Sequence, residues 1–345
     1  MKDIPKNRLR VLLVSPFTFS YHIAICEALE RLGFDPIWWD DKASRSTLYK
    51  IALRLLPGLT RRLTEATFFD RLSQLPNDSI EHILIIKGEG LNARVVQRLR
   101  ASQPRAPLGL YLWDSVDNVK GVEEILHLVD VVASFDPVDA KENGWTYRPL
   151  FARNVALSAA DQATKDFDWC FIGTIHSDRH KVITRLRRNS GGKARSFVFA
   201  YFQSKLVLRI RKLVDWTLWS APAGTLSTTP MPAAEVASVI ARSRAVLDVE
   251  HPKQRGLTMR TIETLLTGKK LITTNQHLLE CDLYDPSRAQ MIDRHAPRID
   301  QAFLDEPVLP VSQVLHQRYT CEAWAAELLN LQMNRTMTCT LETNP

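Results

Sequence analysis

The sequence predicts an α/β protein built from two Rossmann-like, doubly wound domains that face a common cleft. Short apolar runs alternate with segments of helical periodicity along most of the 345 residues. This pattern stops near Phe151 and restarts at Asp168. The chain is also longer than the roughly 250–300 residues at which single cores tend to divide. We therefore expect an N-terminal domain over residues 1–155, a C-terminal domain over 156–325, and a helix end and tail over 326–345.

In the first half, continuous apolar runs indicate strands covered on both faces, and a 3.6-residue apolar period indicates helices. Strands are expected at Arg10–Ser15, Asp35–Trp39, His82–Ile86, Leu108–Trp113, Asp130–Ser134 and Trp145–Arg148. Helices are expected at Tyr21–Leu32, in two pieces around Pro57 within 44–75, up to Leu99, at Val122–Leu128 and up to Asn143. Four or five parallel strands with helices between them make one complete domain.

The irregular segment Phe151–Asp166 is the expected linker, and the same alternation begins again after it. Strands are expected at Asp168–Ile172, Ser196–Ala200, Ala245–Val249, Leu271–Thr274 and Gln290–Ile292. Helices are expected at Asp178–Arg188, Lys205–Leu218, Pro232–Ala241, Leu257–Leu266 and Cys321–Leu331. The tail after Asn334 is expected to be disordered.

The charge of the chain indicates an anionic partner. The net charge is +7 and the isoelectric point is near 9.2, which favours a nucleotide or a phospholipid surface. Lysines and arginines gather in two segments, residues 45–62 and 185–212. Neither segment has the pattern of a nucleic-acid-binding module, so no nucleic-acid partner is expected.

The five cysteines are scattered and lack metal-ligand spacing, which argues against a zinc site and favours reduced thiols in a cytoplasmic protein. The apolar part of the N-terminus is too short for a signal peptide. No apolar run approaches the roughly 20 residues that span a membrane. The segment Lys205–Trp219 carries Leu, Ile and Trp between cations. It can lie on an anionic surface at the inner face of the cytoplasmic membrane, or pack against the core as an ordinary helix.

The segment Ala245–Asn275 reads as strand, polar loop, helix and strand, with its polar residues gathered where the first strand ends. Ligands of open α/β sheets bind at that end. A helix N-terminus binds phosphate through backbone N–H groups, and glycine permits close approach. The arginines of this segment can hold a diphosphate, and its glutamate can accept hydrogen bonds from ribose hydroxyls. The candidate binding residues are Glu250, Arg255, Gly256, Thr258, Arg260 and Glu263.

The run Glu263–Leu271 (ETLLTGKKL) resembles a motif of the GT-B glycosyltransferases, in particular bacterial enzymes that build surface polysaccharides such as O-antigen and capsule. By this resemblance Glu263 binds the ribose of a nucleotide-sugar donor. Two positions depart from the motif, because threonine follows the glutamate and lysine replaces the proline. The second acid of the two-glutamate form of the motif would fall at Arg255, and the nearest upstream acid is Glu250. Retention or inversion at the sugar is therefore left open.

The loop after the strand Asp168–Ile172 resembles the first loop of the nucleotide-binding half of GT-B enzymes. The resemblance implies that Gly173 and Thr174 approach the donor phosphates and that Arg179 or Lys181 neutralises them.

An inverting transferase needs a carboxylate or a histidine to take the proton of the acceptor hydroxyl. Asp114 and Glu89 are the first candidates for this catalytic base, because each follows a buried strand, and His22 is the next. Each of the three can equally be a helix cap or a turn residue. Asp136 and Asp139 resemble turn and N-cap residues more closely.

Asp248 and Glu250 superficially fit the Asp-x-Asp pair that holds a divalent ion in GT-A transferases. In GT-B chemistry, cationic side chains and helix dipoles take the place of that ion. We expect neither a metal nor a cofactor, and we treat the nucleotide-sugar as a substrate.

The expected function is transfer of a sugar from a nucleotide-sugar to a glycan or lipid-linked acceptor in bacterial envelope polysaccharide synthesis. The second half would bind the donor and the first half the acceptor. Two alternatives are a nucleotide-sugar epimerase on the same fold, which needs no acceptor, and a non-catalytic nucleotide- or glycan-binding partner, which releases no nucleotide.

Overall fold

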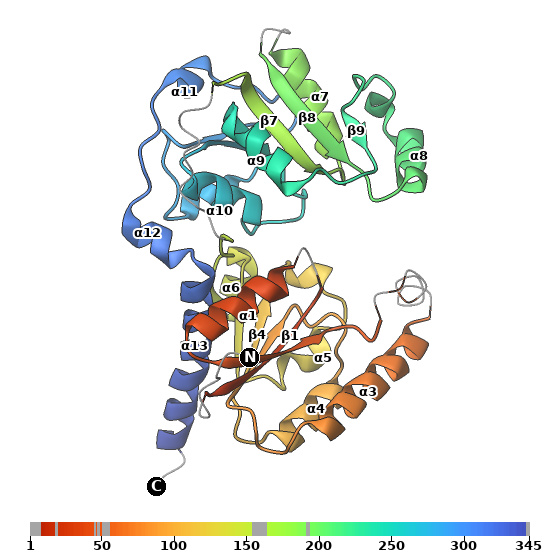
Figure 1. Ribbon diagram of the computed structural model, residues 1–345, viewed down its shortest axis with the longest axis vertical. Coiled ribbons are helices and arrows are strands. Elements are labelled where there is room, and N and C mark those ends of the chain that lie inside the picture. The colour runs from red at the N-terminus through yellow and green to blue at the C-terminus, as the bar shows by residue number, and fades with distance from the viewer. Residues whose placement is uncertain are drawn as a thin grey trace. The chain divides into compact units, whose positions relative to one another are not determined.

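The structure, a computed structural model, divides the chain into two compact units. The first unit is Met1–Leu150 together with Tyr319–Pro345, and the second is Phe151–Arg318. Each unit contains a six-stranded parallel sheet with helices around it (Figure 1). The residues that the structure describes are 8–17, 20–44, 46, 49, 56–153, 164–190 and 194–342.

The first sheet has the strand order β2-β1-β3-β4-β5-β6. Its strands are β1 (Arg10–Ser15), β2 (Asp35–Asp40), β3 (His82–Ile86), β4 (Leu108–Leu112), β5 (Val131–Ser134) and β6 (Thr146–Tyr147). The order reverses beside β1, where Val11 pairs with Pro36 of β2 on one side and with His82 of β3 on the other. All six segments expected to be strands pair in this sheet, so it exceeds the four or five parallel strands expected for the domain; the last of them, β6, lies within the predicted Trp145–Arg148.

Helices cover both faces of the first sheet (Figure 1). They are α1 (Tyr21–Arg31), α3 (Pro57–Gln74), α4 (Ala93–Ser102), α5 (Glu123–Leu126), α6 (Pro137–Asn143) and α13 (Cys321–Glu342). Helix α3 begins at Pro57, where the sequence predicts a break between two helical pieces. The piece predicted before Pro57 lies mostly outside the described residues. Asp136 caps α6 by accepting the N–H groups of Val138 and Asp139, which confirms its predicted N-cap role.

The C-terminal helix α13 packs on the first unit, although residues up to 325 were expected in the C-terminal domain. The Trp324 ring meets the Tyr111 ring edge-on with centroids 4.9 Å apart, and the Gln332 amide donates to the carbonyl of Ile83 over 3.2 Å. Helix α13 continues to Glu342, past Asn334, after which a disordered tail was expected. The added residues include no proline or glycine that would end a helix.

The second sheet has the strand order β12-β11-β10-β7-β8-β9. Its strands are β7 (Phe167–Thr174), β8 (Ser196–Tyr201), β9 (Leu226–Ser227), β10 (Ser243–Asp248), β11 (Lys270–Thr273) and β12 (Ala289–Met291). The chain builds outward from β7 to β9 and then returns to the other side of β7, so the order reverses between β7 and β10. The predicted linker lies largely outside the described residues.

Helices also cover both faces of the second sheet. The helices of this unit are α7 (Arg179–Asn189), α8 (Lys205–Val214), α9 (Ala233–Ala241), α10 (Met259–Leu266), α11 (Gln301–Asp305) and α12 (Gln313–Arg318). Alternate residues of β7 enter different apolar clusters, since Trp169 packs with α7 whereas Cys170 packs with α9. The helix predicted over Lys205–Leu218 ends earlier, at Val214. It ends there because Asp215 caps a separate 3₁₀ turn over Trp216–Leu218. Within the described part of the chain, no helix has the length and hydropathy that a membrane crossing requires.

Candidate functional site

The candidate site lies in the second unit, at the carboxyl edge of the parallel sheet. Loops follow β7, β10, β11 and β12 at this edge, and the strand order reverses between β7 and β10. In open α/β sheets a ligand binds beside such a reversal. The loops carry most of the binding residues predicted from the sequence.

Asp248, the last residue of β10, fixes the start of α10. Its buried carboxylate accepts hydrogen bonds from the hydroxyls of Thr258 (2.5 Å) and Thr261 (2.8 Å). The Thr258 hydroxyl in turn accepts the N–H of Thr261 over 3.0 Å and caps the helix. Asp248 is therefore committed to positioning the helix.

The first turn of α10 presents unsatisfied donors. Among the described residues, the N–H groups of Met259 and Arg260 have no acceptor, and the Arg260 guanidinium forms no hydrogen bond or ion pair. The loop before the helix is held by Asn275, whose amide donates to the carbonyls of Arg255 (3.3 Å) and Gly256 (3.2 Å). These are the properties of an anion site.

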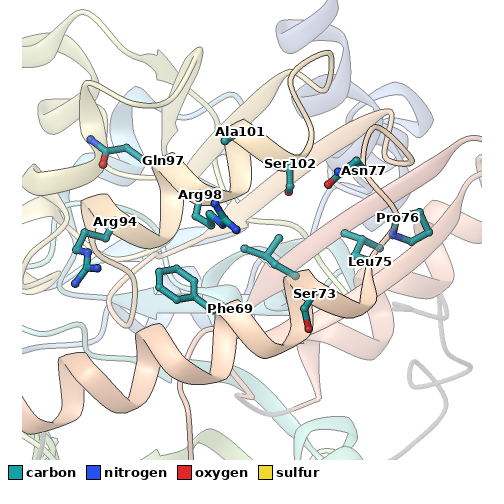
Figure 2. A pocket seen from close by; sticks show the side chains of 11 residues that line it. Phe69, Ser73, Leu75, Pro76, Asn77, Arg94, Gln97, Arg98, Ala101 and Ser102 are labelled. Carbon is teal, nitrogen blue, oxygen red and sulfur yellow. The ribbon is translucent and has the colours of Figure 1, made fainter.

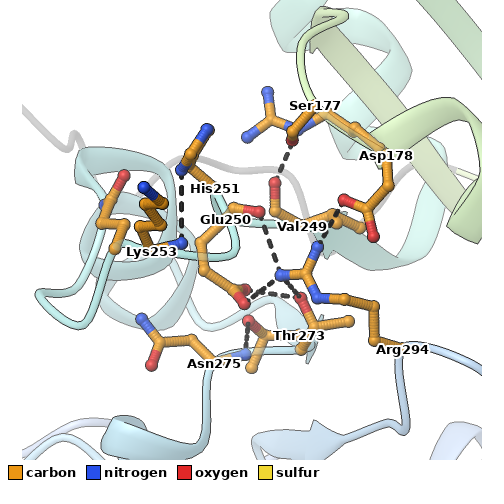
Figure 3. Close-up of polar contacts among 12 residues, drawn as sticks. Ser177, Asp178, Val249, Glu250, His251, Lys253, Thr273, Asn275 and Arg294 are labelled. Atoms are coloured by element: carbon orange, nitrogen blue, oxygen red, sulfur yellow. Dashed lines mark hydrogen bonds and ion pairs between the residues drawn. The ribbon is translucent and has the colours of Figure 1, made fainter.

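Glu250 and Arg294 form the centre of a buried polar network (Figure 3). Arg294 is paired with Glu250 and donates to Asp178 over 2.8 Å, and the Glu250 carboxylate also accepts the hydroxyl of Thr274 over 2.5 Å. Burial raises the pKa of Glu250, and Thr274 and Arg294 oppose that rise. The network joins the loops after β7, β10, β11 and β12.

Arg179 joins the two strands that flank the reversal. Its guanidinium donates to the carbonyls of Val249 (2.6 Å) and Thr174 (2.8 Å). The nearby Gly173 leaves room for the Phe171 ring, because an added Cβ would lie 3.3 Å from that ring. Arg179 thus brings a positive charge to the sheet edge and also holds the edge together.

Two histidines face each other in this site, with ring centroids 5.7 Å apart. They are His176, which follows β7, and His251, which follows β10. Burial and the neighbouring Arg179 lower the pKa of His176 to about 4. Its imidazole is therefore neutral at pH 7 and can exchange hydrogen bonds with a ligand without carrying a charge.

Glu263 lies on α10, one turn beyond the anion site. Burial raises the pKa of its carboxyl, while Arg260 and Arg153 oppose that rise. The Arg153 guanidinium lies 3.9 Å from the carboxylate, and part of the side chain is exposed. An acceptor for hydroxyl groups is thus available beside the unsatisfied donors.

In the first unit, Glu89 and Asp114 follow β3 and β4 and share one lysine. Lys87 lies 3.4 Å from the Glu89 carboxylate and 2.8 Å from that of Asp114, and Lys42 lies 3.0 Å from Glu89. Burial alone would raise the pKa of Glu89, but the two lysines lower it. Lys87 also holds a φ of 68°, a left-handed conformation that costs energy for a side chain of this kind. Asp114 is the more accessible carboxylate, with 40% of its side chain exposed.

His22 and Asp41 lie at the same edge of the first sheet. The His22 ring is buried and stacks on Trp38 with centroids 4.2 Å apart. Asp41 follows β2 and is 0% exposed, and neither of its carboxylate oxygens has a hydrogen-bond partner among the described residues. Burial raises the pKa of Asp41 to about 7, with Lys42 opposing the rise. The backbone of Asp41 lies so close to Gly90 that a Cβ there would be 1.8 Å from its carbonyl oxygen.

The structure thus places the predicted donor-site residues on adjoining loops and on the helices that follow them, and the three base candidates at the carboxyl edge of the first sheet. The sequence reading missed Arg294, Asn275 and Asp41. Asp41 directly follows β2 and Arg294 lies three residues after β12, and a position after a strand end is the signal that selected the other candidates. No cluster of three or more His, Cys, Asp or Glu that could hold a metal occurs in the described ranges.

A cavity of about 1020 Å³ lies on the first unit between α3 and α4, away from the base candidates (Figure 2). Phe69 and Leu72 line one side and Arg94 and Arg98 the other. The cavity extends to Pro76 and Ser102, which precede β3 and β4. It therefore belongs to the amino-end side of these strands, opposite the edge where ligands of such sheets bind.

Comparisons with known proteins support the fold. No family model and no curated protein matches the sequence. Among solved structures, the catalytic domain of starch synthase IV from Arabidopsis thaliana, bound to ADP and acarbose, is similar with a TM-score of 0.58. It is 8% identical, over 95% of this chain and 99% of that chain. Anabaena Alr3699/HepE, in complex with UDP and glucose, has a TM-score of 0.54 and 9% identity, over 96% and 100%.

AviGT4, a glycosyltransferase of avilamycin A biosynthesis, has a TM-score of 0.54 and 13% identity, over 94% of this chain and 97% of that chain. At such low identity these similarities bear on the fold alone. They confirm the predicted two-domain, Rossmann-like α/β fold.

Proposed function

We propose that this protein is a glycosyltransferase that moves a sugar from a nucleotide-sugar donor to a glycan or lipid-linked acceptor. The proposal includes the setting expected from the sequence, bacterial envelope polysaccharide synthesis. Among the structures with a similar fold, AviGT4 is described as a glycosyltransferase. Another is a starch synthase bound to ADP and acarbose, and a third is bound to UDP and glucose. The second unit of this chain would bind the donor.

One observation carries the proposal: the first turn of α10 offers two N–H groups and the Arg260 guanidinium at the carboxyl edge of a parallel sheet. Backbone donors with a positive side chain suit a diphosphate, whose charge grows when the bond to the sugar breaks. Glu263, one turn further on, would accept the ribose hydroxyls. Donors that are in place before the reaction need no rearrangement at the transition state.

The first unit would bind the acceptor and supply the base. Asp114 is the strongest candidate, because it is the most exposed of the three and its lysine partner holds it in place. Glu89 is bound by two lysines, and His22 is buried against Trp38, so both are less available to an acceptor hydroxyl. No metal or cofactor is part of the proposed reaction.

A thermal-shift screen with UDP, GDP, CMP, dTDP, ADP and their sugars tests the donor site. A ligand that binds only the folded protein raises its unfolding temperature. We expect one nucleotide to do so, and we expect Arg260→Gln and Glu263→Ala each to weaken its binding by roughly tenfold, through loss of charge-assisted hydrogen bonds. Arg188→Gln, which removes an exposed cation of α7, is the matched control and should bind normally.

Unchanged nucleotide affinity in both site variants would refute the placement of the donor. Incubation of the protein with the nucleotide-sugar that it binds, in the absence of an acceptor, distinguishes a glycosyltransferase from an epimerase. An isomerised sugar would identify an epimerase. Release of nucleotide that depends on an added glycan or lipid-linked sugar is the outcome that the proposal requires.

A further inference from the structure

Helix α8 and the 3₁₀ turn after it expose a large apolar surface in the second unit. No residue of α8 is buried. Two of the exposed side chains, Leu213 and Trp216, are 76% and 82% exposed. We call this the α8 surface, and its members are Leu206, Ile210, Leu213, Val214, Trp216 and Trp219.

The helix has two faces of different character. At about 100° per residue, Leu206, Ile210, Leu213 and Val214 fall within an arc of about 100°. Val207 and Leu208 lie outside this arc and pack against the core of the second unit. The sequence-based alternative of an ordinary core-facing helix therefore describes only one side of α8. The helix is anchored through one side, and it leaves a second apolar side in solvent.

Cations border the apolar arc on both sides. Lys205, Arg209 and Lys212 fall on one flank and Arg211 on the other, by the same helical geometry. Within the described part of the chain none of the four forms an ion pair, and Lys212 Nζ lies 4.9 Å from the centroid of the Trp219 ring. The sequence of α8 has no acidic residue, and the carboxylate of the following Asp215 is buried and bonded to Thr217.

We infer that the α8 surface docks onto a membrane whose headgroups are anionic. Exposed Trp and Leu side chains enter the interface of a bilayer, while flanking Lys and Arg meet negative headgroups. The helix has ten residues, about 15 Å, which is half the thickness of a hydrocarbon core, so it would lie in the interface and not cross it.

A second copy of the chain is a poorer occupant. The net charge is +7, and a two-fold contact through this surface would bring cationic flanks together. An anionic bilayer instead complements the flanks and the apolar arc at once. The surface belongs to α8 and the turn after it and not to α10, so its binding to vesicles can be measured without donor or acceptor.

Flotation of the full-length protein with vesicles tests this inference. We expect binding to phosphatidylcholine vesicles that contain phosphatidylglycerol, weaker binding to phosphatidylcholine alone, and loss of the difference at high salt. The double variant Leu213→Ser, Trp216→Ser should reduce the vesicle-bound fraction by about tenfold or more, since both side chains are solvent-exposed and leave the core intact. Arg209→Gln with Lys212→Gln should remove the preference for anionic lipid.

The matched control is the double variant Leu309→Ser, Val314→Ser, which removes exposed apolar side chains away from α8 and should bind vesicles as the unmodified protein does. Equal vesicle binding by the Leu213, Trp216 variant and the unmodified protein would overturn the inference. So would a failure of the unmodified protein to bind anionic vesicles. Light scattering that showed a dimer which Leu213→Ser, Trp216→Ser dissolves would also overturn it, because a second copy would then cover the surface.

Discussion

At the residue scale, the carboxyl of Asp41 links the stability of the first unit to pH. Its pKa is about 7 in the folded protein and near 3.8 when exposed, so the folded state holds a proton over the range between these values. Stability from this group is complete below pH 3.8 and is lost as the pH rises to 7, because ionisation would place an unpaired charge in the interior.

Asp41→Asn should remove this dependence. A shift of about three pKa units corresponds to roughly 4 kcal/mol of unfolding free energy. We expect the stability of the variant relative to the unmodified protein to rise by up to that amount between pH 4 and pH 8. Denaturant unfolding at both pH values measures the change, and other titrating groups cancel because both proteins contain them. A difference that is equal at the two pH values would contradict the assignment.

Arg294 shows why part of the candidate site could not be predicted from the sequence. It lies 44 residues after its partner Glu250, and the pairing of β10 with β11 and of β11 with β12 brings the two together. Arg255, Arg260 and Glu263 were easier to select, because they share one loop and one helix. The hydrogen bonds of Arg179 to main-chain carbonyls also could not be predicted, because a sequence identifies a cationic side chain but not its acceptors.

At the element scale, α10 depends on the contact between its cap and the strand before it. Thr258→Ala would remove the hydroxyl that joins Asp248 to the N–H of Thr261. We expect the unfolding free energy to fall by about 1–2 kcal/mol, as for other lost N-caps, and the proposed nucleotide site to weaken as the first turn frays. Urea unfolding and nucleotide titration measure the two effects.

Thr258→Ser is the control for this change, because serine keeps the hydroxyl and should retain both stability and binding. A Thr258→Ala protein with normal nucleotide affinity would show that the first turn of α10 does not contact the ligand.

Elements with a long apolar run were predicted closely, and elements fixed by tertiary contacts were not. The strands Arg10–Ser15 and His82–Ile86 have the predicted bounds, because their residues are buried on both faces. The two-residue strand β9 has no such pattern and exists only through its pairing with β8. Helix α8 ends early because the Asp215 side chain accepts the N–H of Thr217 and caps the next turn. Such a side-chain bond to the backbone competes with continuation of the helix.

At the scale of the whole molecule, the two-unit fold followed from the repeated alternation of strands and helices, but the place of α13 did not. The Gln332 side chain packs on Gly109, where a Cβ would lie 2.4 Å from its amide nitrogen, and its carbonyl bonds His82 at 3.0 Å. Such contacts join residues about 250 positions apart along the chain. Amphipathic periodicity shows that a helix packs somewhere, and it does not identify the sheet that it covers.

Trp324→Ala should loosen the first unit and leave the second unit unchanged. The side chain is fully buried against Tyr111, and its loss should lower the stability of this unit by about 3–5 kcal/mol. Hydrogen exchange should then accelerate in β4 and not in β7. Trp169→Ala should produce the opposite pattern, because Trp169 lies in the core of the second unit. Equal acceleration in both sheets by either variant would mean that the units do not unfold separately.

The placement of α13 has a consequence for how the protein is made. The six strands of the first sheet lie between Arg10 and Tyr147, but the helix that covers part of one face begins at Cys321. During synthesis the ribosome must therefore translate the entire second unit before the first can close. Until then the Tyr111 ring and the backbone at Gly109 lack their covering helix, and a nascent chain in that state is a natural client for chaperones that bind exposed apolar surface.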